Sequence, residues 1–215
     1  FIYQIFIILI LFLSPFIILA RLIKKKEHNR RFLEKFCLPS KKRGEGKLIW
    51  IHAASVGEFL SVVPIIDKLE KNKKIKTILI TTSTLSSSRI FYNYKFKKTI
   101  HQFFPIDFFY FSQKFLNYWK PTMAIFVDSE IWPSMYEKIY KKKIPLLLVN
   151  ARMTSKSFQR WQLFPKFAKK VFDKITIALP QNNETKNYLK KLGVKKVKLL
   201  GNLKYVKNGK QHKTS

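Results

Sequence analysis

The sequence predicts an α/β protein built on a doubly wound, Rossmann-like parallel sheet. Short apolar runs rich in β-branched residues alternate along the chain with longer amphipathic stretches. The runs are apolar throughout, as expected for strands that helices bury on both faces. Their regular alternation with helical patterns, over short connections, favours parallel strands joined by helical crossovers.

The individual elements follow from these patterns in chain order. Strands are expected at residues 47–53, 76–82, 99–104, 123–128, 144–150, 175–180 and 197–201. Helices are expected near residues 57–71, 84–96, 108–119, 131–142, 155–173 and 182–192. We therefore place the Rossmann-like domain at residues 47–200 and the start of an interdomain connection at residues 201–215.

The N-terminal segment is expected to lie outside this sheet. Residues 1–20 contain no charged side chain, and as a helix they would span about 30 Å, the thickness of a bilayer's hydrocarbon core. We predict a transmembrane anchor over residues 1–23, followed by a basic juxtamembrane linker over residues 24–46 that stays on the cytoplasmic side. A cleaved signal peptide and a buried helix of a soluble protein are the alternatives.

Composition narrows the classes of function. The apolar fraction of 47% excludes an intrinsically disordered chain, and the single cysteine, Cys37, excludes a disulfide scaffold. The net charge of +31 points to an anionic partner such as nucleic acid, anionic lipid or a phosphorylated substrate. Heavy use of Lys, Ile, Phe and Asn is also what A+T-rich coding produces, so the charge does not require a partner. No nucleic-acid-binding motif is present, and we expect no nucleic acid partner.

Ligands of such sheets bind beyond the carboxyl ends of the strands. The first expected strand is followed by Ser55-Val-Gly57-Glu58, which has the spacing of a helix capping box. In that interpretation Ser55 accepts from the Glu58 amide and Glu58 bonds back to the Ser55 amide. In a functional interpretation Gly57 lets a substrate approach closely, and Glu58 accepts a proton from a substrate hydroxyl.

Other polar residues follow the later strands. Asp128 and Glu130 form a pair of carboxylates that serves either catalysis or the capping of the next helix. Arg152, two residues after Asn150, is either a phosphate or carboxylate clamp or a solvated surface residue. His52 is either a phosphate ligand or a satisfied core histidine. The histidines lack metal-ligand spacing, and no dinucleotide fingerprint or covalent-nucleophile motif occurs, so no metal or cofactor is expected.

Six motifs in order carry a family resemblance: IWIHAASVGEF, FFPID, DSEIWPS, NARMTSKS, Gln181 and GNLKY. Together they resemble the N-terminal half of the bacterial 3-deoxy-D-manno-octulosonic acid (Kdo) transferases. The resemblance implies a membrane-anchored GT-B glycosyltransferase at the cytoplasmic face of the inner membrane. It implies inverting, metal-independent transfer of Kdo from CMP-Kdo to a lipid A precursor during lipopolysaccharide synthesis.

The resemblance also assigns roles to individual positions. It implies that Glu58 is the general base and that Glu130 is required for activity. Substrate-binding roles are expected for the remaining matched positions, which are Ser55, Gly57, Asp128, Asn150, Arg152, Gln181, Asn202 and Lys204.

The chain departs from the family pattern at several positions. Asp128 replaces a glutamate, Ser134 replaces an asparagine, and Thr84-Leu-Ser-Ser87 replaces a T-P-T-G loop. The second GT-B domain, with most of the CMP-Kdo contacts, is expected to be missing after Ser215, which would leave the fragment inactive alone. The competing hypothesis is a membrane-tethered module that binds anionic lipid without catalysis.

Overall fold

The computed structural model describes residues 2–199 and contains a six-stranded parallel sheet of order β3-β2-β1-β4-β5-β6. The strands are β1 (Leu48–His52), β2 (Thr77–Thr82), β3 (Thr99–Phe103), β4 (Met123–Val127), β5 (Leu146–Ala151) and β6 (Ile177–Pro180). The order reverses between β1 and β4, which pair with each other, and this is the switch point at which doubly wound sheets bind ligands. The predicted α/β class is confirmed.

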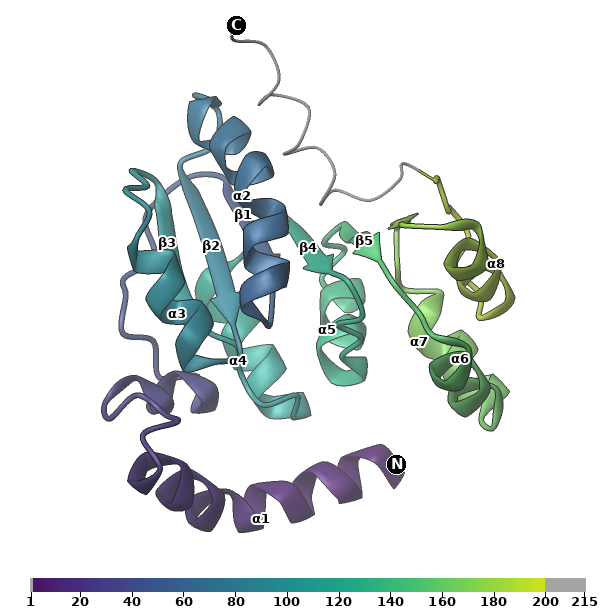
Figure 1. Ribbon diagram of the computed structural model, residues 1–215, viewed down its shortest axis with the longest axis horizontal. Helices are drawn as coiled ribbons and strands as arrows, with labels where there is room; N and C mark the ends of the chain where they lie inside the picture. The colour runs from purple at the N-terminus through teal and green to yellow at the C-terminus, as the bar shows by residue number, and fades with distance from the viewer. Residues whose placement is uncertain (1, 200–215) are drawn as a thin grey trace, which may run out of the picture.

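Helices cover both faces of the sheet (Figure 1). They are α2 (Val56–Lys71), α3 (Leu85–Tyr92), α4 (Phe109–Trp119), α5 (Pro133–Lys141), α6 (Ser155–Gln162), α7 (Pro165–Phe172) and α8 (Asn183–Lys191). Buried side chains of α2 and α3 form one core cluster with the sheet, and those of α4 to α8 form the other. This two-sided burial explains why the strands are apolar throughout.

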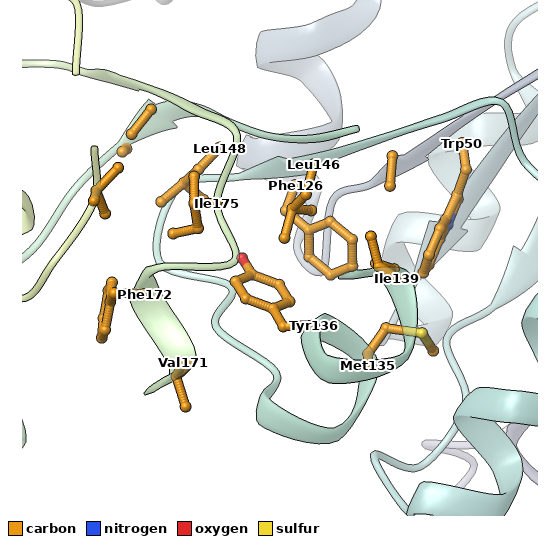
Figure 2. Packing of buried hydrophobic residues seen from close by; sticks show 14 of the residues in the cluster. Trp50, Phe126, Met135, Tyr136, Ile139, Leu146, Leu148, Val171, Phe172 and Ile175 are labelled. Carbon is orange, nitrogen blue, oxygen red and sulfur yellow. The ribbon is translucent and has the colours of Figure 1, made fainter. Parts of the chain in front are cut away.

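The larger core cluster is rich in aromatic rings. The Trp50 ring lies 4.8 Å from that of Phe115, and the Phe126 ring lies 5.3 Å from that of Tyr136. Figure 2 shows Tyr136 below Phe126, between Trp50 on one side and Phe172 of α7 on the other. Large aromatic side chains bury more apolar area than any others, so they dominate the packing of β1 and β4 against α5.

Two predicted elements differ in the structure. The single helix expected at residues 155–173 is divided into α6 and α7, because Pro165 lacks an amide hydrogen and disfavours a helical conformation at Phe164 before it. The seventh strand, expected at residues 197–201, is reduced to one bridge between Ala178 and Val197 among the described residues. Residues 200 and 201 lie outside them.

The N-terminal segment forms α1 (Ile2–Ile23), which lies across the lower end of the domain in Figure 1. Among residues 2–199, no helix is both long enough and apolar enough to cross a membrane. The single-pass transmembrane anchor predicted over residues 1–23 is therefore not supported. The first turn of α1 contacts the domain, where the Tyr3 hydroxyl donates to Asp107 at 2.6 Å and the Tyr3 ring packs on Phe167.

The basic segment after α1 contains a short 3-10 helix, η1 (Arg31–Phe36), that docks on β3. The Glu34 carboxylate accepts from Arg31 Nε at 2.7 Å and from the Phe103 amide at 2.7 Å. Arg31 also donates to the His101 carbonyl at 3.0 Å. Burial and the Arg31 charge hold the pKa of His101 well below its usual value. Hydrogen bonds from this ion pair to the backbone of β3 thus hold the segment against the edge of the sheet.

Candidate functional site at the carboxyl ends of the strands

The Ser55–Glu58 motif forms the N-terminus of α2. Ser55 is extended and its hydroxyl accepts from the Glu58 amide at 3.3 Å, as the capping box predicts. The return bond is different from the predicted one, because Glu58 Oε2 accepts from the Ala54 amide at 2.8 Å. The Ser55 hydroxyl itself donates to the other oxygen, Oε1, at 2.9 Å. Two donors therefore fix the orientation of this carboxylate.

The same carboxylate is poised for proton transfer near neutral pH. The pKa of Glu58 is raised from 4.5 to about 7, first by burial and next by the negative charge of Glu130, with a smaller contribution from Asp128. The hydrogen bonds from Ser55 and Ala54 oppose this rise. A general base works best with a pKa near the working pH, so the environment of Glu58 suits that role.

Gly57 leaves the approach to Glu58 open. Gly57 is exposed, and a Cβ built on it would meet no atom within 4 Å. Its backbone is helical, so no positive φ requires glycine here. Neither local strain nor packing accounts for the missing side chain, and the space beside the helix end is free for a ligand.

Glu130 lies in the loop between β4 and α5 and is held by donors from other parts of the fold. Its Oε2 faces His52 Nε2 at 3.1 Å and accepts from Trp132 Nε1 at 2.8 Å. The Tyr136 hydroxyl donates to the Glu130 carbonyl at 2.9 Å. His52 is fully buried and stacks on Phe104 at 3.9 Å between ring centroids. Glu130 is thus an anchored acid and not a free side chain of a loop.

Asp107 caps α5, a role that was considered for Asp128 and Glu130. The Ser134 and Met135 amides at the start of α5 donate to Asp107 at 2.9 and 2.7 Å. Asp107 follows β3, and its side chain is almost completely buried. Pro133 occupies the first turn of α5, where the missing amide hydrogen of proline costs no helical hydrogen bond.

A second polar group lies where β4, β5 and β6 end. Asp128 and Asn150 have left-handed backbones, with φ of 63° and 52°. The Asp128 carbonyl accepts from the Arg152 amide at 3.3 Å, and the Asn150 carbonyl accepts from Gln181 Nε2 at 2.9 Å. Non-glycine residues rarely adopt positive φ, and such residues concentrate at functional sites.

A cavity of about 280 Å³ opens next to this second group. It is lined by the polar residues Asp128, Ser129, Arg152, Thr154 and Ser157 and by Met153. Arg152 is exposed, so its guanidinium is available to a ligand in this cavity. Thr154 caps α6 by accepting from the Ser157 amide, which places the N-terminus of α6 at the same opening.

The structure thus brings the predicted residues into two neighbouring groups. Ser55, Gly57, Glu58 and Glu130 lie at the ends of β1 and β4, and Asp128, Asn150, Arg152 and Gln181 lie at the ends of β4, β5 and β6. Asn202 and Lys204 lie outside the described residues. Within residues 2–199, no group of three or more His, Cys, Asp or Glu side chains is arranged to hold a metal ion.

The sequence alone left the roles of His52 and Asp107 open. His52 was open between a core histidine and a ligand, and it is buried as a core residue yet contacts Glu130. Asp107 was noted only as part of a motif. For His52 the available signal was a polar residue at the end of an otherwise apolar strand, and for Asp107 it was an acid in the loop after β3. Their partners lie far away in the sequence.

This arrangement defines a Rossmann-like domain of the GT-B type. Among solved structures, UDP-GlcNAc 2-epimerase from Neisseria meningitidis shares the fold, with a TM-score of 0.52 and 15% identity over 73% of this chain and 47% of that one. A UDP-N-acetylglucosamine 2-epimerase from Listeria monocytogenes gives a TM-score of 0.53 at 13% identity, over 74% of this chain and 46% of that one.

The sequence identifies the family. Residues 30–207 match the model of the 3-deoxy-D-manno-octulosonic-acid transferase (Kdo transferase) family, and the chain belongs to it. It is 36% identical over 189 residues to a Kdo transferase of Rickettsia bellii, covering 88% of this chain and 45% of that protein. It is 38% identical to a probable mitochondrial Kdo transferase of Arabidopsis thaliana, covering 75% of this chain and 37% of that protein. The chain therefore spans less than half the length of these relatives.

Proposed function

We propose that this chain is the acceptor-binding half of a glycosyltransferase that transfers Kdo from CMP-Kdo to a lipid A precursor in lipopolysaccharide synthesis. Membership of the Kdo transferase family supports the sugar that is transferred. The observation that carries the chemical role is Glu58, a carboxylate with a pKa of about 7 beside the open position of Gly57.

In the proposed reaction, Glu58 takes the proton of an acceptor hydroxyl while that oxygen attacks the anomeric carbon of Kdo. The bond from this carbon to the CMP phosphate oxygen breaks, and CMP leaves with the electron pair from the opposite face. The configuration is therefore inverted. The chemistry requires proton transfer, orientation and charge stabilisation, and the proposal includes no metal or cofactor.

The other residues of the two groups are assigned to acceptor binding. Arg152 and the α6 N-terminus offer donors to an anionic or hydroxyl group in the cavity beside Asp128. Asn150 and Gln181 lie beside this region, where Gln181 Nε2 donates to the Asn150 carbonyl. Asn202 and Lys204 are proposed from the family motif alone. CMP-Kdo is proposed to bind mainly to a second domain.

Glu58→Gln in a full-length Kdo transferase that contains this chain tests the proposal. We expect Kdo incorporation into lipid A precursor to fall about 10²- to 10⁴-fold, because the amide cannot accept the proton. Glu70→Gln is the matched control, since Glu70 lies at the other end of α2, where its carboxylate accepts from Lys98 and Thr99 of the β3 edge. The control should keep normal turnover per folded molecule. Near-normal turnover of Glu58→Gln would remove the catalytic role.

We further propose that the protein works at the cytoplasmic face of the bacterial inner membrane, where a lipid acceptor is found. The support is the exposed apolar side chains of α1, among them Phe12 at 76% and Phe16 at 70% exposure, next to a basic segment. Each basic residue near an anionic surface adds roughly 1 kcal/mol of attraction.

Binding of this chain to phosphatidylglycerol vesicles tests the membrane proposal. Phe12→Ser with Phe16→Ser should weaken binding, whereas Leu163→Ser, an exposed apolar residue on another element, should leave it nearly unchanged. Equal binding by all variants would contradict a role for α1. Vesicle binding combined with full turnover of Glu58→Gln would instead favour a chain that binds lipid without supplying the catalytic base.

A further inference from the structure

A chain of hydrogen bonds runs from the core to Glu130. Trp50 Nε1 donates to Thr81 Oγ1 at 2.9 Å, and Thr81 Oγ1 lies 3.0 Å from His52 Nδ1. On the other side of the ring, His52 Nε2 lies 3.1 Å from Glu130 Oε2. Trp50, Thr81 and His52 are completely buried, so water cannot replace any of these partners.

The donors and acceptors fix the direction of these hydrogen bonds. An indole nitrogen only donates, so Thr81 Oγ1 accepts from Trp50 and keeps its single hydrogen for another acceptor. An ionised carboxylate only accepts, so Nε2 carries the proton that is donated to Glu130, and Nδ1 of the neutral ring accepts the Thr81 hydrogen. The opposite tautomer would place the Nε2 lone pair against a carboxylate oxygen, which is unfavourable.

The backbone carbonyl of Thr81 does not reverse this assignment. It lies 3.2 Å from His52 Nδ1 and accepts the Ala53 amide at 3.0 Å as part of the sheet, whereas Thr81 Oγ1 lies closer to Nδ1, at 3.0 Å. The register explains why the groups meet, because His52 of β1 lies opposite Thr81 of β2 and Trp50 lies two residues earlier on the same strand face.

We infer that His52 is a positioning residue, whose tautomer is set by Trp50 and Thr81 and whose Nε2–H holds the Glu130 carboxylate in place beside Glu58. The link to catalysis rests on the proposed function, whereas the tautomer does not. Trp132 Nε1 donates to the same oxygen of Glu130 at 2.8 Å, so this oxygen has two donors and its charge is stabilised.

The charges around Glu130 show what this positioning does. His52 faces it from β1, Tyr136 from α5 and Glu58 from α2, while Asp128 belongs to its own loop. After burial, the charge of Glu130 is the strongest cause of the raised pKa of Glu58. A Glu130 that moved away, or took up a proton, would let the pKa of Glu58 fall toward its ordinary value.

Nuclear magnetic resonance of this chain, with ¹⁵N-labelled histidine and ¹³C-labelled glutamate, tests the inference without an activity assay. The ring nitrogens of His52 should show a protonated Nε2 and an unprotonated Nδ1. His101 provides an internal reference, because Arg31 donates to its Nδ1 at 2.7 Å and leaves Nε2–H for Thr82 Oγ1 at 2.8 Å. A protonated Nδ1 in His52, in either the other tautomer or the doubly protonated ring, would overturn the inference.

Thr81→Val and Thr81→Ser form the matched pair. Valine removes the hydroxyl, so we expect Nδ1 of His52 to become protonated and the titration midpoint of Glu58 to fall by roughly half a pH unit or more. Serine keeps the hydroxyl and should retain both wild-type signals. His101 should be unchanged in both variants, which shows that the fold is intact.

The outcomes separate this inference from the proposed function. An unchanged Glu58 midpoint in Thr81→Val, with His101 signals intact, would overturn the positioning role. If Thr81→Val does not fold, the ring nitrogens of the wild-type chain still decide the tautomer. Full activity of Glu58→Gln would refute the proposed function, yet it would leave the tautomer result as it stands.

Discussion

Glu58 and Asp107 are two carboxylates that follow strands of the sheet and lie in different surroundings. Each accepts hydrogen bonds from backbone amides, and burial raises the pKa of each, to about 7 for Glu58 and about 6 for Asp107. The two sites differ in their surroundings. Asp107 is closed in by the α5 amides and by the Tyr3 hydroxyl, whereas Glu58 lies beside exposed Gly57 and two further acids.

Hydrogen-bond donors alone therefore do not separate a structural carboxylate from a reactive one. At Asp107 the further interactions are hydrogen bonds that lower the pKa and use both oxygens. At Glu58 the further charges are negative and raise the pKa, although this chain has only 12 acids against 43 bases. Several acids gathered at an open edge of the sheet indicate a reactive site, whereas a single acid enclosed by donors indicates a helix cap.

The largest effect on stability is expected from opening the closed site. Asp107→Ala leaves the Ser134 and Met135 amides of α5 without their acceptor, so the free energy of unfolding should fall by about 3 kcal/mol. Urea unfolding followed by circular dichroism measures this loss. Asp67→Ala, at an exposed position of α2, is the control and should change stability by less than about 0.5 kcal/mol. An equal loss of stability in Asp107→Ala and Asp67→Ala would contradict the assignment of Asp107 as the cap of α5.

The next effect comes from filling the open site. Gly57→Ala places a methyl group where no atom lies within 4 Å, so the protein should keep its melting temperature or gain slightly. In the full-length enzyme, the kcat/KM for the acceptor should nevertheless fall about tenfold or more, because the methyl group would occupy the approach to Glu58.

Gly44→Ala is the control for this substitution, since its Cβ would make only an ordinary contact, 3.4 Å from Thr77 Oγ1. It should leave the kcat/KM unchanged. Wild-type activity of Gly57→Ala would show that no acceptor passes this position.

A smaller effect is expected where α1 meets Asp107. Tyr3→Phe keeps the ring contact with Phe167 but removes the hydroxyl that donates to Asp107 at 2.6 Å. The free energy of unfolding should fall by about 1 kcal/mol, and the pKa of Asp107 should rise further. Tyr110→Phe, at an exposed tyrosine, should change neither quantity. If Tyr3→Phe changed neither the free energy of unfolding nor the pKa of Asp107, α1 would not dock through this bond.

A separate effect is a difference in pH dependence between the two carboxylates. Asp107 contributes stability that is fully present below pH 3.8 and is lost as the pH rises through about 6, because folding raises its pKa. For Glu58 the corresponding window runs from 4.5 to about 7. Urea unfolding at a series of pH values should show Asp107→Ala differing from wild type across the lower window and Glu58→Gln across the upper one. If both variants differed from wild type over the same pH range, the different environments assigned to Asp107 and Glu58 would be contradicted.

Much of this molecule could be predicted from local sequence. The strands are continuous apolar runs, and the Ser55–Glu58 motif begins α2 because residues three apart in sequence meet across one helical turn. The candidate acids Asp128 and Glu130 were predicted from the same logic, since a strand end followed by a helix places them at the edge of the sheet. Local sequence also predicted the helix α1, but not that its first turn contacts the domain.

The tertiary structure alone decided which of these residues act on one another. Asp107 accepts from the Ser134 amide of α5, 27 residues later, and His52 contacts the Glu130 carboxylate, 78 residues away. His52 meets Glu130 because the strand order places β1 beside β4, and Asp107 meets α5 because the helix that follows it, α4, packs against α5. Local propensity fixes the conformation of a few neighbouring residues, whereas contacts between distant residues depend on the packing of the whole sheet, which no short pattern encodes.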